Sequence, residues 1–197
     1  DIAWAVHSTS KDALLATVTN DYGTEAVPIL SASTSASSSD SVVVPPTTTQ
    51  TLTWKYLREL GVAYWLSDQS ILVSLMESCA KAEYKRNKDP LGYAFLLFLA
   101  LDRKGVLLGL LRTDGKYRRL FVLLSNDFKH GRWQEAALTN AFNALQTKKF
   151  YAAVGFFILA EALTEAVNVC VRQLRDFQLA LVLCRLVQGY SKQVHVL

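Results

Sequence analysis

Cysteine and histidine are scarce in this sequence, with three of each among its 197 residues. The three cysteines, Cys79, Cys170 and Cys184, are odd in number, lie far apart and are flanked by apolar residues at helical spacing. That pattern predicts buried, reduced thiols rather than disulfides. The histidines are distant from the cysteines along the chain, so no metal-ligand spacing occurs. We therefore expect neither a disulfide nor a bound metal.

Catalytic motifs are also missing. The glycine-containing stretch GVLLGLLRTDGK at 105–116 lacks the Gly-Lys-Ser/Thr ending of a phosphate-binding loop. No G-x-S-x-G, H-E-x-x-H, C-x-x-C or kinase signature occurs. The nearest i,i+4 carboxylate pair, Glu161 and Glu165, has no evident acid–base partner and is more typical of solvated surface. We predict that the chain is not an enzyme, with no catalytic residue and no cofactor.

No apolar run is long enough to cross a membrane. The longest, residues 93–101 and 150–160, end at Asp102-Arg103-Lys104 and at Glu161. They are about half of the roughly 20 residues that a membrane span requires, so we expect buried helices of a core. The chain begins at Asp1 rather than at Met and ends inside a mixed segment, so we expect a piece of a longer protein.

Residues 31–51 contain no aromatic residue. Ser and Thr make up 12 of these 21 positions, and a Pro pair interrupts them. Such a segment predicts a flexible, disordered linker, and an insertion tolerated in a surface loop is favoured over a phosphorylation site. Residues 1–30 are predicted as a short helical segment of the same domain, with a helix at 10–17. A hairpin of the strands IAWAV and LLATV is the alternative.

Apolar residues are abundant, at 51% of the chain, and from residue 53 they recur at helical spacing. The first predicted helix starts at Trp54, is capped by Thr53 and breaks at Gly61. The next covers 68–86 with Ser67 as its cap. Pro90 is placed at the first position of a helix over 90–102, which is apolar on nearly every side and therefore buried. Further helices are expected at 105–112 and 116–124.

A repeated spacing organises residues 132–187. Four times a bulky apolar residue precedes an Ala by three positions, at Trp133/Ala136, Phe150/Ala153, Leu163/Ala166 and Phe177/Ala180. The intervals of 17, 13 and 14 residues each fit one helix and a short turn. Each pair lies on one helix face, where a neighbouring helix can pack over the Ala. We predict an all-α fold, an α-solenoid of stacked helical hairpins over 52–189, followed by a tail at 190–197.

Positive charge concentrates between residues 81 and 119, although the whole chain carries only +4. This stretch has ten Lys and Arg against four Asp and Glu, an excess of six (ten minus four). A docking face for an acidic partner protein is one interpretation, with Lys85, Arg86, Lys88, Arg118 and Arg119 as its candidate residues. Ordinary solvated surface is the more general interpretation, because most of these residues fall at helix ends and turns. Nucleic acid and anionic lipid are less favoured.

Several stretches taken together resemble one family. They are DIAWAVHS at 1–8, TWKYLRELGVAYWL at 53–66, RNKDPLGYAFLLFLALDRKGVLLGLLR at 86–112, NDF at 126–128, RWQEAALTNAFNAL at 132–145 and FYAAVGFFILAEALTEAVNVCVRQLRDFQLALVLCRL at 150–186. In these motifs the chain is similar to the helical region near the C-terminus of the RAVE large subunit, the regulator of vacuolar H+-ATPase assembly, and of its rabconnectin and DmX-like relatives. The linker at 31–51 departs from the family, in which these helices join more directly.

The resemblance implies a cytoplasmic, non-catalytic scaffold recruited peripherally to endosomal and vacuolar membranes. It implies that the protein helps to reunite the peripheral catalytic sector of the proton pump with its membrane sector. The implied partners are peripheral-sector subunits and Rogdi-like accessory subunits, and no site residue follows from the motifs. Two other classes stay open, a vesicle-coat or trafficking solenoid and a basic helical-repeat nucleic-acid binder.

Overall fold

The computed structural model describes residues 15, 18, 52–112, 115–128 and 131–194, with the backbone alone for 190–194. Within these residues every regular element is a helix, which confirms the all-α prediction. The predicted linker at 31–51 and most of the predicted helix at 10–17 lie outside them. Leu15 and Val18 are described, both are helical, and Val18 joins the core at 3% exposure.

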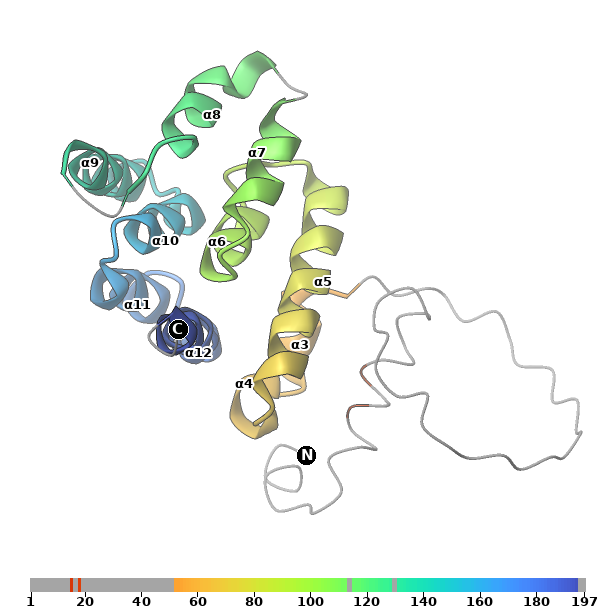
Figure 1. Ribbon diagram of the computed structural model, residues 1–197. Helices are drawn as coiled ribbons and strands as arrows, with labels where there is room; N and C mark the ends of the chain where they lie inside the picture. Colours follow the sequence, from red (N-terminus) through yellow and green to blue (C-terminus); the bar gives the residue numbers. More distant parts are fainter. Residues whose placement is uncertain (1–14, 16–17, 19–51, 113–114, 129–130, 195–197) are drawn as a thin grey trace, which may run out of the picture.

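Figure 1 shows how the helices are arranged in space. The short helices α3 (Trp54–Glu59) and α4 (Val62–Trp65) lie beside the long α5 (Gln69–Asn87), and α6 (Tyr93–Ala100) and α7 (Lys104–Arg112) stand in the middle. A 3-10 turn, η1 (Gly115–Tyr117), leads into α8 (Arg118–Leu124) at the top. The last group is α9 (Arg132–Gln146), α10 (Phe150–Leu159), α11 (Leu163–Arg172) and α12 (Phe177–Val194).

The beginnings of two helices differ from the predictions. Asp68, not Ser67, caps α5, because its Oδ1 accepts hydrogen bonds from the Ser70 and Ile71 N–H groups at 2.8 and 3.1 Å. A carboxylate also suits the positive end of the helix dipole. α6 begins at Tyr93 rather than at Pro90. The side chain of Asp89 accepts a hydrogen bond from the Leu91 N–H at 3.0 Å, and residues 90–92 form a turn before the helix.

The predicted start of α3 and the four helices predicted in 132–187 agree with the structure. Thr53 caps α3 by accepting from the Tyr56 N–H at 3.3 Å, and Gly61 separates α3 from α4 with a left-handed φ of 65°. The four helices predicted in 132–187 are α9 to α12, each packed against the next. α6 also packs against α10, across three intervening α-helices. A solenoid repeat contacts only its sequence neighbours, so the solenoid stays a prediction within the confirmed all-α class.

Three of the four Ala residues in the predicted repeat are packing positions. Ala153 and Ala166 are fully buried and Ala180 is 5% exposed. In α9 the adjacent Ala137 is buried, while Ala136 is only half-buried. The bulky partner in α12, Phe177, is 63% exposed and lies outside the core, which the repeat did not predict.

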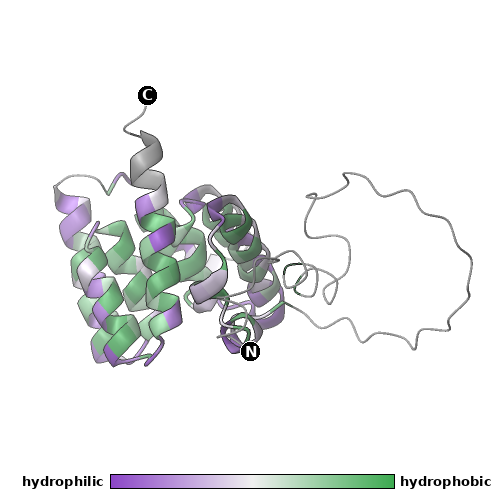
Figure 2. Cartoon of the chain, turned by 90° about the horizontal axis from the view of Figure 1, so that it is seen from below, coloured by the Kyte–Doolittle hydropathy of each residue, from purple (hydrophilic) through white to green (hydrophobic). Residues whose placement is uncertain are grey.

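α6 is the centre of the hydrophobic core. All eight of its residues are buried, as its apolar sequence predicted, because it packs against α5, α7, α10 and α12. Gly155 of α10 allows the closest approach: a Cβ at this position would lie 2.5 Å from the ring of Phe95. Figure 2 shows hydrophobic residues along most of the packed helices and hydrophilic ones towards their ends.

Polar side chains join the first described helices to the last one. Arg185 of α12 donates to the Leu66 carbonyl at 2.6 Å, and Gln69 of α5 donates to the Arg185 carbonyl at 3.0 Å. Gln178 donates to the carbonyl of Arg58 in α3 at 2.9 Å. These bonds connect residues more than 110 positions apart and hold α12 against the α3–α5 group.

Cys79 and Cys170 are buried, as predicted, whereas Cys184 is only half-buried. Burial raises the pKa of both Cys79 and Cys170 from 9.0 to about 12. The unfolded chain therefore releases these protons at lower pH than the folded chain does. The stability that the buried, protonated thiols contribute is present below about pH 9 and falls as the pH rises above it.

Replacing one buried thiol should make the stability of the chain less dependent on pH. Between about pH 8 and about pH 10, the free energy of unfolding of the unsubstituted chain should fall by about 1 kcal/mol more than that of the Cys79→Ala variant, as measured by urea unfolding.

Candidate functional site

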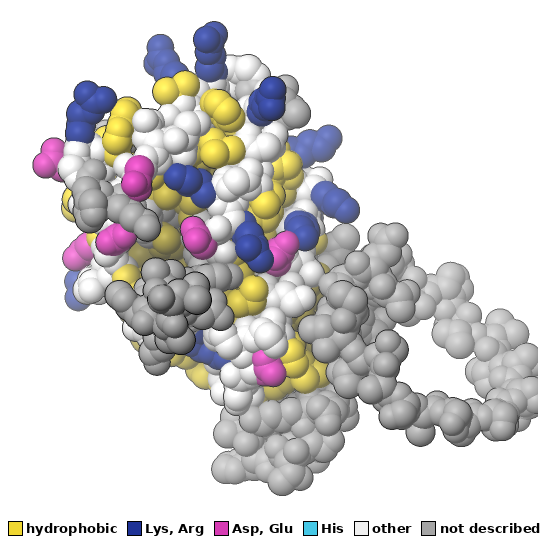
Figure 3. Space-filling model, in the orientation of Figure 1, with side chains coloured by type: hydrophobic (Ala, Val, Ile, Leu, Met, Phe, Trp, Pro, Cys, Tyr) yellow, Lys and Arg dark blue, Asp and Glu magenta, His cyan; other side chains and the backbone are white. Residues whose placement is uncertain are grey.

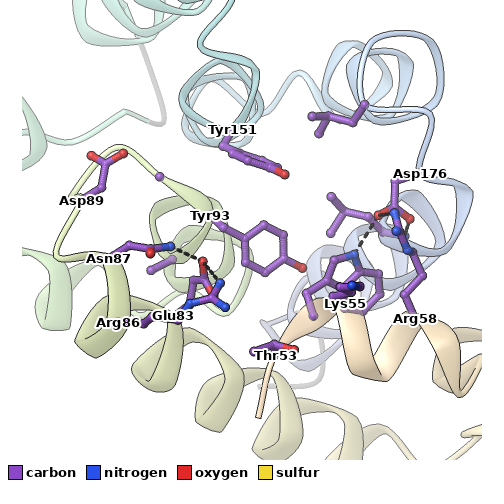
Figure 4. A pocket seen from close by; sticks show the side chains of 15 residues that line it. Thr53, Lys55, Arg58, Glu83, Arg86, Asn87, Asp89, Tyr93, Tyr151 and Asp176 are labelled. Carbon is purple, nitrogen blue, oxygen red and sulfur yellow. Dashed lines mark hydrogen bonds and ion pairs between the residues drawn. The ribbon is translucent and has the colours of Figure 1, made fainter. Parts of the chain in front are cut away.

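The ends of five helices converge on a cleft of about 410 Å³. The N-terminal turns of α3, α6 and α10 reach it, together with the C-terminal turn of α5 and the start of α12 (Figure 4). Helix ends carry unpaired N–H and C=O groups, and polar side chains collect where such ends meet. The cleft accordingly combines an aromatic floor with ionised side chains from both sides.

Asp176 forms the polar contact on one side of the cleft. It is 6% exposed, and its Oδ2 accepts from Trp54 Nε1 at 2.7 Å and from Arg58 at 3.3 Å. Its Oδ1 accepts from the Leu179 N–H at 2.9 Å, in the first turn of α12. One buried carboxylate therefore fixes the start of α12 to two side chains of α3.

Glu83 forms the contact on the opposite side. It is 7% exposed, and both of its oxygens accept from Arg86 Nη2, at 2.8 and 2.6 Å. Asn87 donates to the same carboxylate. This cluster belongs entirely to the last turns of α5, so the charge of Arg86 is paired within its own helix.

Two tyrosines lie between these carboxylates. Tyr93 stacks on Trp54 with ring centroids 6.3 Å apart and meets Tyr151 edge-on at 5.4 Å. The Tyr93 hydroxyl is buried without a hydrogen-bond partner and points into the cleft (Figure 4). Burial raises the pKa of both phenols, and the charge of Asp176 adds to the effect, so both stay protonated at neutral pH.

The buried carboxylates of the cleft are held by the protein's own donors. Among the described residues no Ser, Cys or His lines the cleft, and both carboxylates accept from two or more donors. The searched residues hold no group of three or more His, Cys, Asp or Glu that could bind a metal.

The five predicted docking residues lie on two separate elements. Lys85, Arg86 and Lys88 are exposed at the C-terminal end of α5, and Lys88 is its left-handed cap with a φ of 49°. Arg118 and Arg119 are exposed in the first turn of α8. α5 packs against α6 and α12, whereas α8 packs against α7 and η1. The five residues therefore come from two helices, and their forming one docking face stays a prediction.

Nearby charges compensate part of this basic zone. Glu77 pairs with Lys81 at 2.8 Å and with Arg103 at 3.5 Å. Lys104 donates to the Asn126 carbonyl at 2.9 Å and lies over the ring of Phe128. Among the described residues Lys85, Lys88, Arg118 and Arg119 have no acidic partner, so these four carry the uncompensated charge of the predicted face.

Comparison with known families accounts for most of the chain. The family model described as "RAVE protein 1 C terminal" matches residues 32–197. The chain belongs to the RAVE protein 1 C-terminal family. It is 40% identical to human DmX-like protein 1 over 137 residues, which cover 70% of this chain. It is 30% identical over 194 residues, 96% of the chain, to the Saccharomyces cerevisiae regulator of V-ATPase in vacuolar membrane protein 1.

This RAVE protein 1 C-terminal segment spans 4% of the length of the human relative and 12% of the yeast one. The family resemblance of the sequence is thereby confirmed. Among the described residues no helix combines the length and the hydropathy that crossing a bilayer requires.

Sequence reasoning did not find the cleft of this RAVE protein 1 C-terminal segment. Asp176 and Trp54 are 122 positions apart, and nothing in either local pattern indicates that they meet. One signal was present: Asp176 directly precedes an apolar helical stretch, the position of an N-cap.

Proposed function

We propose that this chain is a non-catalytic scaffold segment of a vacuolar H+-ATPase assembly factor. It promotes the reassembly of the peripheral catalytic sector with the membrane sector through protein–protein contacts. The match to the RAVE protein 1 C-terminal family carries the proposal, together with relatives named regulators of V-ATPase in the vacuolar membrane. In the cleft, Asp176 joins α3 to α12 and Glu83 pairs within α5, so both buried carboxylates have structural partners.

The proposed partners are subunits of the peripheral sector and Rogdi-like accessory subunits. Association would take place on the cytoplasmic side, with peripheral recruitment to vacuolar or endosomal membranes. Four exposed cations, Lys85, Lys88, Arg118 and Arg119, are the proposed docking residues. Arg86 contributes less than the sequence indicated, because Glu83 already holds its guanidinium. Exposed charges of this kind increase association rate and selectivity.

A pull-down with purified peripheral-sector subunits tests this function. Reversing Lys85, Lys88, Arg118 and Arg119 to Glu should weaken capture by the 197-residue chain on the order of tenfold at low salt, and added salt should reduce the difference. Lys148→Glu with Lys149→Glu reverses two exposed charges outside the basic zone and should leave capture nearly unchanged.

Two results would contradict the proposal. Capture of vesicle-coat subunits in place of pump subunits would favour a trafficking solenoid. Tight RNA binding with a steep salt dependence would favour a nucleic-acid binder. If pump subunits are captured equally by the reversed and unreversed chains, the scaffold function stands and the basic docking residues are wrong.

A further inference from the structure

The hairpin of α7 and α8 leaves much of its apolar surface uncovered. Five of the seven residues of α8 are apolar, yet Leu124 alone is buried. Val122 is 55% exposed, Val106 of α7 is 38% exposed, and Leu120, Phe121 and Leu123 are only half-buried. α8 packs against α7 and η1, and its Leu123 also packs against a small cluster of Phe128, Ala137 and Ala160. An exposed apolar patch with a polar rim is typical of an interaction site.

The rim of this patch is basic. Residues 103–124 carry six Lys or Arg against a single Asp. Arg103 and Lys104 are used inside the fold, by Glu77 and by the Asn126 carbonyl. Arg112, Arg118 and Arg119 form no ion pair with another described residue, and Lys116 lies over the Tyr117 ring, 5.4 Å from its centroid. Figure 3 shows Lys and Arg side chains around hydrophobic ones at the top of the molecule, where Figure 1 places α8.

The patch contains a shallow, open hollow. A hollow of about 610 Å³ is lined by Gly115, Lys116, Arg118, Arg119 and Val122, with no acidic residue among them. We refer to these five residues as the α8 groove. A concave surface with an apolar residue and three cations fits a row of apolar side chains flanked by carboxylates.

We propose that the α8 groove binds an acidic amphipathic helix of a partner protein. Apolar side chains at i, i+3, i+4 and i+7 of that helix would cover Val122 and the half-buried residues of α8. Its flanking Asp and Glu would face Arg118, Arg119 and Lys116. This inference rests on the proposed function, because it assumes that the chain works by binding proteins. It assigns the docking contact to the residues of the α8 groove and does not include Lys85 and Lys88.

A synthetic peptide tests the groove without any pump subunit. The probe is a fluorescein-labelled helix of roughly five turns, with Leu at the four spaced positions and Glu along both flanks. Fluorescence anisotropy follows its binding to the 197-residue chain. Two substitutions in the chain, Val122→Asp and the pair Arg118→Glu with Arg119→Glu, should each weaken binding on the order of tenfold. The control pair Lys148→Glu with Lys149→Glu has the same charge change as the arginine pair and should not weaken it.

Each alternative predicts a different result. If the arginine pair and the control lysine pair weaken peptide binding equally, the peptide is bound by net charge alone. If a peptide in which Ser replaces the Leu residues binds as tightly as the original peptide, the apolar contact is excluded. The proposal would also be overturned if the chain does not bind the peptide. It would be overturned as well if the chain binds vesicles of equal phosphatidylserine and phosphatidylcholine and this binding depends on the same residues. Unchanged circular dichroism and melting temperature should accompany all the variants, because the substituted side chains are exposed. Capture of pump subunits without peptide binding would leave the proposed function intact and reject the groove alone.

Discussion

Gly155→Ala should lower the free energy of unfolding by about 2 kcal/mol, because the added methyl group has no room. Its Cβ would lie 2.5 Å from the Cδ1 and Cε1 atoms of Phe95 and 3.1 Å from Leu99 Cδ1. Phe95 is fully buried and packs edge-on against Phe156 at 5.3 Å, so its ring cannot move aside without displacing a second ring. The strain exceeds the roughly 1 kcal/mol that Ala gains over Gly in a helix.

The same substitution in α7 provides a matched control. A Cβ at Gly109 meets no atom within 4 Å, so Gly109→Ala should raise stability by about 0.5 to 1 kcal/mol. Urea unfolding of the two variants should therefore move the midpoint in opposite directions. If Gly155→Ala were neutral or stabilising, the close approach of α10 to α6 would be wrong.

Asp176→Ala should cost about 3 kcal/mol of stability, the largest effect that we predict for a single side chain. The substitution removes the acceptor of the buried Trp54 Nε1–H, the partner of Arg58 and the acceptor of the Leu179 N–H in the first turn of α12. A buried donor without a partner loses its hydration and gains nothing in exchange. Arg58 is 46% exposed and recovers water, so most of the loss comes from Trp54 and from the helix start.

A double-mutant cycle identifies the source of that loss. Trp54→Phe removes the indole donor, and combined with Asp176→Ala it should cost at least about 1 kcal/mol less than the sum of the single substitutions. Asp68→Ala removes the exposed cap of α5 and should be milder, because Asp68 bonds only to residues of its own first turn. Additive effects of the Trp54 and Asp176 substitutions would exclude the bond between them as a source of stability.

Local patterns were sufficient to predict most helices. Thr53 and Gly61 delimit α3 through a hydroxyl cap and a left-handed φ, both of which depend on single residue types. At α5 two possible caps, Ser67 and Asp68, are adjacent in sequence, and the one with two backbone hydrogen bonds to its carboxylate prevails. The Pro90 prediction was wrong because Asp89 stabilises a turn where the proline alone would permit a helix.

Contacts between distant residues were beyond those patterns. The apolar sequence of α6 predicts burial on every side but does not identify the partner helices. Its packing against α10 depends on Gly155, a residue that propensity alone disfavours in a helix. The cleft likewise requires Asp176, Trp54 and Tyr93 to meet from three elements. For the five docking residues, the sequence predicted two separate helices but not how those helices lie relative to one another.

The bonds between the α3–α5 group and α12 also determine the order in which this chain can fold. Arg185 and Asp176 bond to residues 118 to 122 positions earlier, so these contacts form only after α12 has been synthesised. Closing a loop of that length is slow, and it raises the contact order of a helical fold that would otherwise be dominated by local pairs. During translation the apolar side chains of α3 and α4 await α12, a period in which a chaperone has surface to bind.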